Sequence, residues 1–182
     1  VETQVGDQLA APTHSGVVEF DNDSYKEADT VVITLTDADL NTNPDIIDIY
    51  SVVSSADDDA MDMVGKANYG VDSTSTANAR MLDVTFDDEL WLKSSATAGS
   101  GTATCSSTPA GGDGLGGSGF TLVETGKNTG VFTGDFQVPA EYCARSSGSG
   151  VVTSVMGTDI EVNYVDYRDA SGEIIEVGDG AG

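Results

Sequence analysis

Residues 130–138 read GVFTGDFQV, a segment in which apolar and polar side chains alternate. Successive side chains of an extended strand point to opposite faces of a sheet. The alternation therefore predicts a strand with one buried and one solvent-facing side, and a helical period of 3.6 residues does not fit it. We expect the core to contain Phe132, Phe136 and Val138 and the surface to carry Thr133, Asp135 and Gln137.

The same period of two recurs along the chain, in β-branched and aromatic segments separated by Gly, Asp, Asn or Pro. Such a series predicts an all-β fold, an immunoglobulin-like or jelly-roll β-sandwich of about eight to nine strands. We expect Trp91, Ile160, Val162 and Tyr164 in its core. The segments are GVVEF (16–20), DTVVITLTD (29–37), IIDIYSVV (46–53), ARMLDVTF (79–86), ELWLKS (89–94), GFTLVET (119–125), GTDIEVNYVDY (157–167) and GEIIEV (172–177).

The charge of the chain excludes some partners. The 31 acidic residues stand against 7 basic ones, a formal net charge of −24, which repels nucleic acid and anionic lipid. No apolar stretch approaches the roughly 20 residues of a membrane span, so we expect no direct membrane insertion. Val1 has the character of a mature N-terminus from which a signal peptide has been removed, which predicts an extracellular or cell-surface protein.

The two cysteines, Cys105 and Cys143, both lie in polar, Gly/Ser-rich surroundings. One disulfide and two free thiols are the alternatives. A disulfide would tie down the Gly/Ser-rich insertion at residues 94–119, contribute roughly 3 to 4 kcal/mol in the chain-entropy model, and indicate an oxidising compartment. The NDS triplet at Asn22 is a candidate glycosylation site.

The segment TDADLNTNPDIID (36–48) is dense in carboxylates and amides. One interpretation is a solvated loop on the surface of a salt-adapted protein. The other is a calcium site, because calcium takes six to eight oxygen ligands and alternating Asp and Asn side chains of a tight loop can converge on one centre. It is not an EF-hand, since the glycine and glutamate of that loop are missing. The candidate ligands are Asp37, Asp39, Asn41, Asn43, Asp45 and Asp48, and a second group is formed by Asp21 and Asp23.

Other acidic groups have the same two interpretations. Asp166, Asp169 and Glu173 surround a predicted turn in NYVDYRDASGE (163–173). No nucleophile motif accompanies the single histidine, His14, and no phosphate-binding glycine loop is present. We therefore expect no enzymatic activity.

Two segments carry a family resemblance. YKEADTVVITLTDADLNTNPDIIDIYSV (25–52) and FTLVETGKNTGVFTGDFQV (120–138) resemble the immunoglobulin-like β-sandwich domains of secreted archaeal and bacterial surface-layer, adhesin-like or extracellular filament proteins. In those domains a TDADLN-type loop and an ETGxNTGVFTG-type hairpin occur together. The resemblance implies a surface-exposed structural module with a metal near the aspartate loop, approached by Glu124 and Asn128. The Gly/Ser-rich insertion, the cysteine pair and the leader depart from that pattern.

The domain prediction is an N-terminal extension at residues 1–16 followed by a single sandwich domain at 17–182. Val1, Thr3 and Val5 alternate with polar residues and are a candidate donor strand for a sheet of a neighbouring copy. The predicted function is a structural subunit of an extracellular filament or surface lattice, a homopolymer assembled by strand addition and stabilised by calcium. The alternative is a monomeric, calcium-rigidified adhesin or stalk module.

Overall fold

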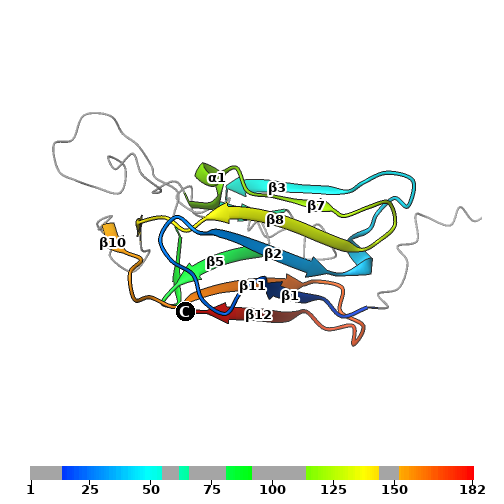
Figure 1. Cartoon of the computed structure of the whole chain (residues 1–182). Coiled ribbons are helices and arrows are strands. Elements are labelled where there is room, and N and C mark those ends of the chain that lie inside the picture. The colour runs from blue at the N-terminus through cyan, green and yellow to red at the C-terminus, as the bar shows by residue number, and fades with distance from the viewer. Residues whose placement is uncertain (1–13, 55–61, 66–80, 92–113, 144–151) are drawn as a thin grey trace, which may run out of the picture.

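The computed structural model describes residues 14–54, 62–65, 81–91, 114–143 and 152–182, which form a β-sandwich of antiparallel strands (Figure 1). The all-β sandwich predicted from the sequence is confirmed. One layer contains, in spatial order, β1 (Val17–Phe20), β2 (Thr30–Thr36), β8 (Val131–Gln137), β7 (Thr121–Glu124) and β3 (Ile49–Ser54). The other contains β4 (Asp62–Val64), β5 (Leu82–Phe86), β11 (Ile160–Asp166) and β12 (Ile175–Ala181), with β6 (Glu89–Leu90) beside β5.

Strand β3 joins the two layers. Its first half, Ile49 to Ser51, pairs with β7, and its second half, Val52 to Ser54, pairs with β4. A strand that changes sheets in this way forms a corner of the sandwich. The remaining elements are a separate hairpin of β9 (Glu141–Cys143) and β10 (Val152–Ser154), a 3-10 helix η1 (Ala38–Leu40) and a short helix α1 (Gly114–Ser118).

The core lies between the layers and follows the predicted alternation. Phe132, Phe136 and Val138 are buried, whereas Asp135 and Gln137 are exposed and Thr133 is half-buried. The expected core residues Ile160, Val162, Tyr164 and Trp91 are buried as well. Trp91 packs against two phenylalanine rings, with centroids 5.6 Å from both Phe86 and Phe136.

Two glycines permit close packing that a larger residue would prevent. Gly134 lies between the buried Phe132 and Phe136, and a Cβ there would come within 2.7 Å of the Phe120 ring. Gly130 has a φ of +61°, and a Cβ there would lie 2.7 Å from Ala38 Cα. Glycine therefore lets the β7–β8 hairpin approach the backbone of η1 closely.

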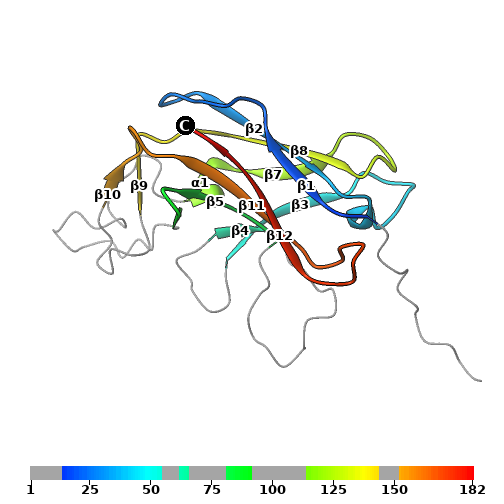
Figure 2. The same ribbon diagram turned by 90° about the horizontal axis from the view of Figure 1, so that it is seen from below.

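Strands β1 and β12 lie side by side where the two layers meet (Figures 1 and 2). The β1 backbone here is bound by carboxylates of the second layer. The Gly16 N–H donates to Asp166 Oδ2 and the Phe20 N–H to Asp179 Oδ2, each over 2.8 Å. After β1, the contact with the end of β12 is made by backbone groups instead of carboxylates. The Tyr25 N–H donates to the Gly182 carbonyl over 2.9 Å.

Several predictions fall on segments outside the described residues. These include the donor-strand residues Val1, Thr3 and Val5, most of the Gly/Ser-rich insertion, and Cys105. The backbone of Cys143 ends β9, but the disulfide stays a prediction because its other partner is not described. Within the part of the chain that is described, no helix is long and apolar enough to cross a membrane.

Candidate functional site

The aspartate loop begins directly after β2, and its first carboxylate is buried. Asp37 is the N-cap of η1, where its Oδ1 accepts the Asp39 N–H over 2.8 Å. Capping of this kind satisfies a helix N–H group that has no partner within the helix. The Asp37 N–H in turn donates to the Gly130 carbonyl over 2.8 Å, which connects the loop to the β7–β8 hairpin.

The later part of the loop binds its own backbone. Asp48 accepts the Thr42 N–H over 2.7 Å and the Thr42 hydroxyl over 2.9 Å. Asn43 Oδ1 accepts the N–H of Asp45, whose own side chain is exposed. Short polar side chains thus serve as acceptors for N–H groups that no sheet partner satisfies, which explains part of the Asp and Asn content of this loop.

The two segments that carry the family resemblance meet at this loop. Asn41 Nδ2 donates to Asn128 Oδ1 over 2.7 Å. Glu124 is buried; its Oε1 accepts the N–H groups of Thr129 and Gly130, and its Oε2 accepts that of Asp48. The N–H of Gly130 above all, with those of Asp48 and Thr129, holds the pKa of Glu124 below its ordinary value of 4.5.

The second predicted ligand pair, Asp21 and Asp23, lies far from the aspartate loop. Asp21 Oδ1 accepts the Tyr25 hydroxyl over 2.7 Å and the Val32 N–H over 2.8 Å, at the turn that connects β1 to β2. Burial acts against the charged form, but these hydrogen bonds keep the pKa of Asp21 below its ordinary value. The aspartate loop follows the other end of β2, so the two groups belong to opposite ends of the strand.

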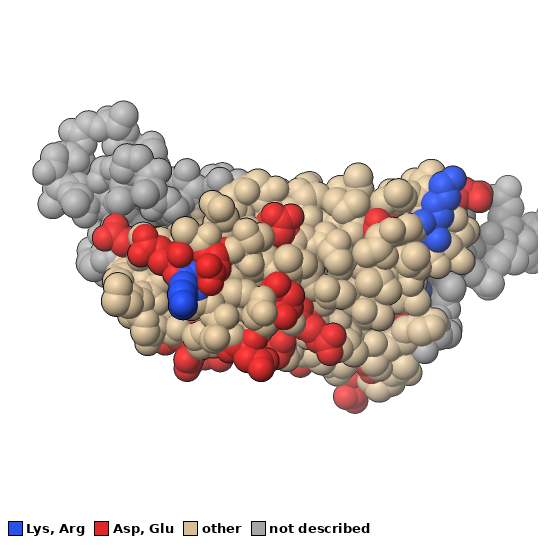
Figure 3. Space-filling view, viewed as in Figure 1, with Lys and Arg blue, Asp and Glu red and all other residues tan. Residues whose placement is uncertain are grey.

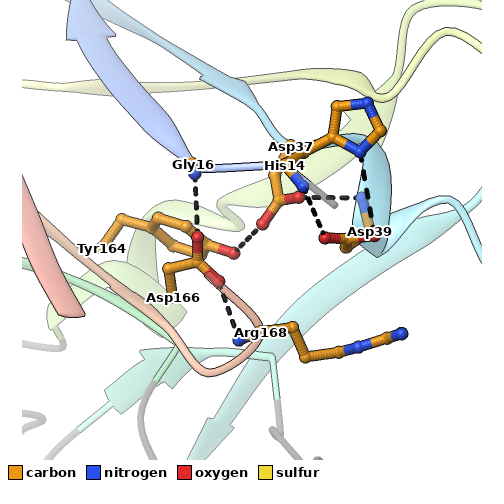
Figure 4. A network of polar contacts seen from close by, with 7 residues as sticks. All are labelled: His14, Gly16, Asp37, Asp39, Tyr164, Asp166 and Arg168. Atoms are coloured by element: carbon orange, nitrogen blue, oxygen red, sulfur yellow. Dashed lines mark hydrogen bonds and ion pairs between the residues drawn. The ribbon is translucent and has the colours of Figure 1, made fainter. Parts of the chain in front are cut away.

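A buried pair connects the aspartate loop to the second layer (Figure 4). The Tyr164 hydroxyl of β11 donates to Asp37 Oδ2 over 2.6 Å. Burial, followed by the charge of Asp37 and this hydrogen bond, raises the pKa of Tyr164. Burial also raises the pKa of Asp37, the Tyr164 and Asp39 hydrogen bonds oppose that shift, and the nearby charges of Asp166 and Asp39 add to it.

Two carboxylates next to this pair bind the backbone of His14 and Gly16, just before β1. The His14 N–H donates to Asp39 Oδ2 over 3.2 Å, and its Nδ1 lies 3.8 Å from Asp39 Oδ1. Asp166 accepts the Gly16 N–H, as described above. We call Asp39 and Asp166 the entry clamp. In the turn after β11, Asp169 Oδ2 accepts the Ser171 N–H over 2.7 Å, and the Ser15 side chain, followed by the Ser171 side chain and N–H, lowers the pKa of Asp169.

The entry clamp and its neighbours are better suited to holding a chain than to reacting with a substrate. Tyr164, Asp37 and Asp166 are only 1%, 2% and 1% exposed, so solvent barely reaches them. The cavity beside them measures about 10 Å³, room for about one water molecule. The Arg168 N–H donates to Asp166 Oδ1 over 2.8 Å, while the Arg168 side chain points away from the carboxylates in Figure 4.

Several of the predicted calcium ligands already have partners within the protein. Asp21 and Asp23 lie apart from the loop, Asp45 faces solvent, and Asp37 and Asp48 bind groups of the protein itself. Across the described ranges, no group of three or more His, Cys, Asp or Glu side chains is placed to hold a metal ion. Calcium binding stays a prediction.

Comparison of the sequence with models of known protein families gave no match, and a search of curated proteins gave none either. The arguments on function therefore depend on the geometry of the chain itself.

Sequence reasoning identified some members of this site and missed their roles. Asp166 and Asp169 were expected as a possible cation group near a turn, and Tyr164 as a core residue. The contacts to residues 14–16 were not foreseen, because they connect positions such as Gly16 and Asp166 that lie 150 residues apart. The sequence did contain one signal for the Tyr164–Asp37 contact. Tyr164 lies on the core face of a predicted strand, and a buried tyrosine hydroxyl usually has a hydrogen-bond acceptor.

Proposed function

We propose that this protein is a structural subunit of an extracellular filament or surface lattice, in which the segment before His14 adds as a strand to a neighbouring copy. The observation that carries the proposal is the entry clamp. Two carboxylates, one from η1 and one from β11, accept the N–H groups of His14 and Gly16 at one end of the sandwich. A segment that binds a neighbouring copy needs a fixed point of attachment on its own copy. Such an attachment reduces the conformational entropy that the segment loses when it binds.

The surface charge supports a role for cations in assembly. Figure 3 shows Asp and Glu side chains gathered along the lower part of the face that it draws. Copies with a net charge of −24 repel one another, and bound cations would reduce that repulsion. Calcium is proposed here as an ion shared between abutting acidic surfaces, because carboxylates are hard oxygen ligands that suit it.

Deletion of residues 1–12 tests the proposal. The full chain is expected to form calcium-dependent polymers in sedimentation and negative-stain microscopy, and these should disperse after EDTA treatment. The deletion variant is expected to keep the near-ultraviolet circular dichroism of the folded protein and to sediment as a monomer. Normal polymers from the deletion variant would refute strand addition by this segment. A full chain that stays monomeric with and without calcium would favour the alternative of a monomeric adhesin or stalk module.

A further inference from the structure

A mostly apolar cavity of about 320 Å³ opens at the end of the sandwich where β12 finishes. It lies between the β1–β2 loop, the segment between β8 and β9, and the β10–β11 loop. Six of the side chains that line it are those of Tyr25, Phe86, Val138, Ala140, Val155 and Met156. Met156 lines the cavity and is 86% exposed, the most exposed large apolar side chain among the described residues.

The β9–β10 hairpin adjoins this cavity. The cavity-lining residues Ala140 and Val155 directly precede β9 and follow β10, and the Val155 N–H donates to the Ala140 carbonyl over 3.1 Å. Among the described strands, β9 and β10 pair only with each other. A two-stranded ribbon is marginally stable alone, and a third strand would satisfy one of its edges.

The cavity and the entry clamp lie at opposite ends of β11. Ile160 at the start of β11 lines the cavity, whereas Asp166 at its end holds Gly16. Seven residues of strand separate them by roughly 20 Å. In Figure 1 the start of β1 and the C-terminal end of β12 lie toward opposite ends of the sandwich. The segment that precedes the entry clamp of one copy is therefore positioned to reach the cavity at the opposite end of the next copy.

We propose that residues 1–13 of one copy bind the cavity and the adjoining edge of the β9–β10 hairpin of the next copy. This inference rests on the proposed function and names its acceptor. In an extended strand the odd-numbered positions of residues 1–9 share one face, and three of its five side chains are apolar: Val1, Val5 and Leu9, with Thr3 and Asp7 between them. The segment has no basic residue and carries Glu2 and Asp7, and the cavity rim includes Lys26 beside Glu27.

The joint is heterologous, because the two copies contribute different surfaces. Repeating it adds subunits head to tail and does not close, which generates a filament. Thirteen extended residues span roughly 40 Å, so the segment is also long enough to fold back onto the cavity of its own copy. The test therefore has to separate binding to the same copy from binding to the next copy.

The first experiment places a photo-crosslinking amino acid at Met156 of the full chain. Unlabelled and ¹⁵N-labelled protein are mixed before assembly, irradiated, digested and analysed by mass spectrometry. The expected products join position 156 to peptides from residues 1–13. If the crosslink forms between copies, products that contain one labelled and one unlabelled peptide should occur at the frequency expected for random mixing of the two proteins. Products of one isotope only would show that the segment binds its own copy, and products with any other segment would identify a different acceptor. Either result overturns the inference.

The second experiment compares two exposed positions. Met156→Glu is expected to raise the critical concentration for assembly about tenfold or more, because a charged carboxylate would be placed in a mostly apolar contact. Ile49→Glu is the matched control, since Ile49 is a similarly exposed apolar residue on the outer face of β3. Equal critical concentrations for the two variants would overturn the inference.

The two proposals fail in different ways. If the full chain forms no polymer, both the proposed function and this acceptor site are wrong. If the full chain polymerises, deletion of residues 1–12 prevents it, and Met156→Glu has no effect, the proposed function stands and only the acceptor site is wrong.

Discussion

Tyr164 and Asp37 are 127 residues apart in the sequence, yet their side chains form a hydrogen bond of 2.6 Å in the interior of the protein. Tyr164 belongs to β11 of one layer, and Asp37 directly follows β2 of the other. The pair therefore connects the two layers through polar atoms, beside the buried Asp166 carboxylate. Asp37 also caps η1, so the same carboxylate fixes the start of the aspartate loop.

Tyr164→Phe should destabilise the protein by about 1–3 kcal/mol, because the buried Asp37 carboxylate loses a hydrogen-bond donor. Urea unfolding measures the free-energy change. A double-mutant cycle with Asp37→Ala, which removes the acceptor, isolates the interaction, and we expect a coupling energy of about 0.5–3 kcal/mol. Effects of the two substitutions that simply add would show that the hydrogen bond contributes nothing to stability.

Gly134→Ala should destabilise the protein by about 1–3 kcal/mol through overpacking. The added methyl group would lie 2.7 Å from the Phe120 ring and 2.8 Å from the Thr121 carbonyl oxygen, and the carbonyl belongs to the backbone of a paired strand. Gly180→Ala is the matched control in β12, where the nearest atoms are 3.8 Å away. Thermal unfolding of both variants should show a much larger decrease in Tm for Gly134→Ala, and similar decreases would contradict this account.

Substitutions of Asn128 separate backbone strain from a lost side-chain contact. Asn128 has a φ of +59° and accepts the Asn41 side chain. Both Asn128→Gly and Asn128→Ala remove the hydrogen bond, but only alanine is strained at this φ, so the alanine variant should be less stable by about 1 kcal/mol. Chemical denaturation measures the difference. Equal stabilities would mean that the hairpin relaxes to another conformation.

Glu124 should make the stability of the protein depend on pH in the acid range. Its folded pKa is lowered, so its contribution is complete above the ordinary value of 4.5 and is lost as the pH falls through the folded pKa. Asp37 acts in the opposite sense, because its raised pKa means that the folded state binds a proton more readily than the unfolded chain does.

The measurement is the Tm of wild type and of Glu124→Gln as a function of pH. The difference between the two curves should shrink as the pH falls below 4.5, since the wild-type carboxylate becomes protonated and approaches the neutral side chain of the variant. Glu27→Gln alters an exposed glutamate and serves as the control. A difference that stays constant from neutral pH to below the folded pKa would exclude the charge of Glu124 as a source of stability.

The sequence predicted the sandwich well because strand periodicity is a local property. The alternation in residues 130–138 identifies both the β8 strand and its buried face, which the burial of Phe132 and Phe136 confirms. The three-residue strands β4, β9 and β10 were not predicted, since so few residues cannot display a period. Pairing with neighbours determines such strands more than their own composition does.

The carboxylates were harder to assign, because an aspartate has the same local sequence whether it binds a metal, a backbone N–H group or water. Asp37 was predicted as one of six calcium ligands, and its contact with Tyr164 depends on the arrangement of two layers. Asp48 was assigned to the same site, and in the structure it binds the backbone of Thr42. Only the three-dimensional placement of the donors distinguishes these roles.

The carboxylates of Asp166 and Asp179 occupy positions along β1 that the carbonyl groups of another strand would otherwise take. An exposed strand edge is a template for unintended pairing and aggregation, and charged side chains on the edge are one way in which proteins prevent it. The negative charge of this protein thus has a short-range effect in addition to long-range repulsion between copies. With the N–H groups of Gly16 and Phe20 already bound to carboxylates, fewer donors beside β1 are left to pair with a strand of another molecule.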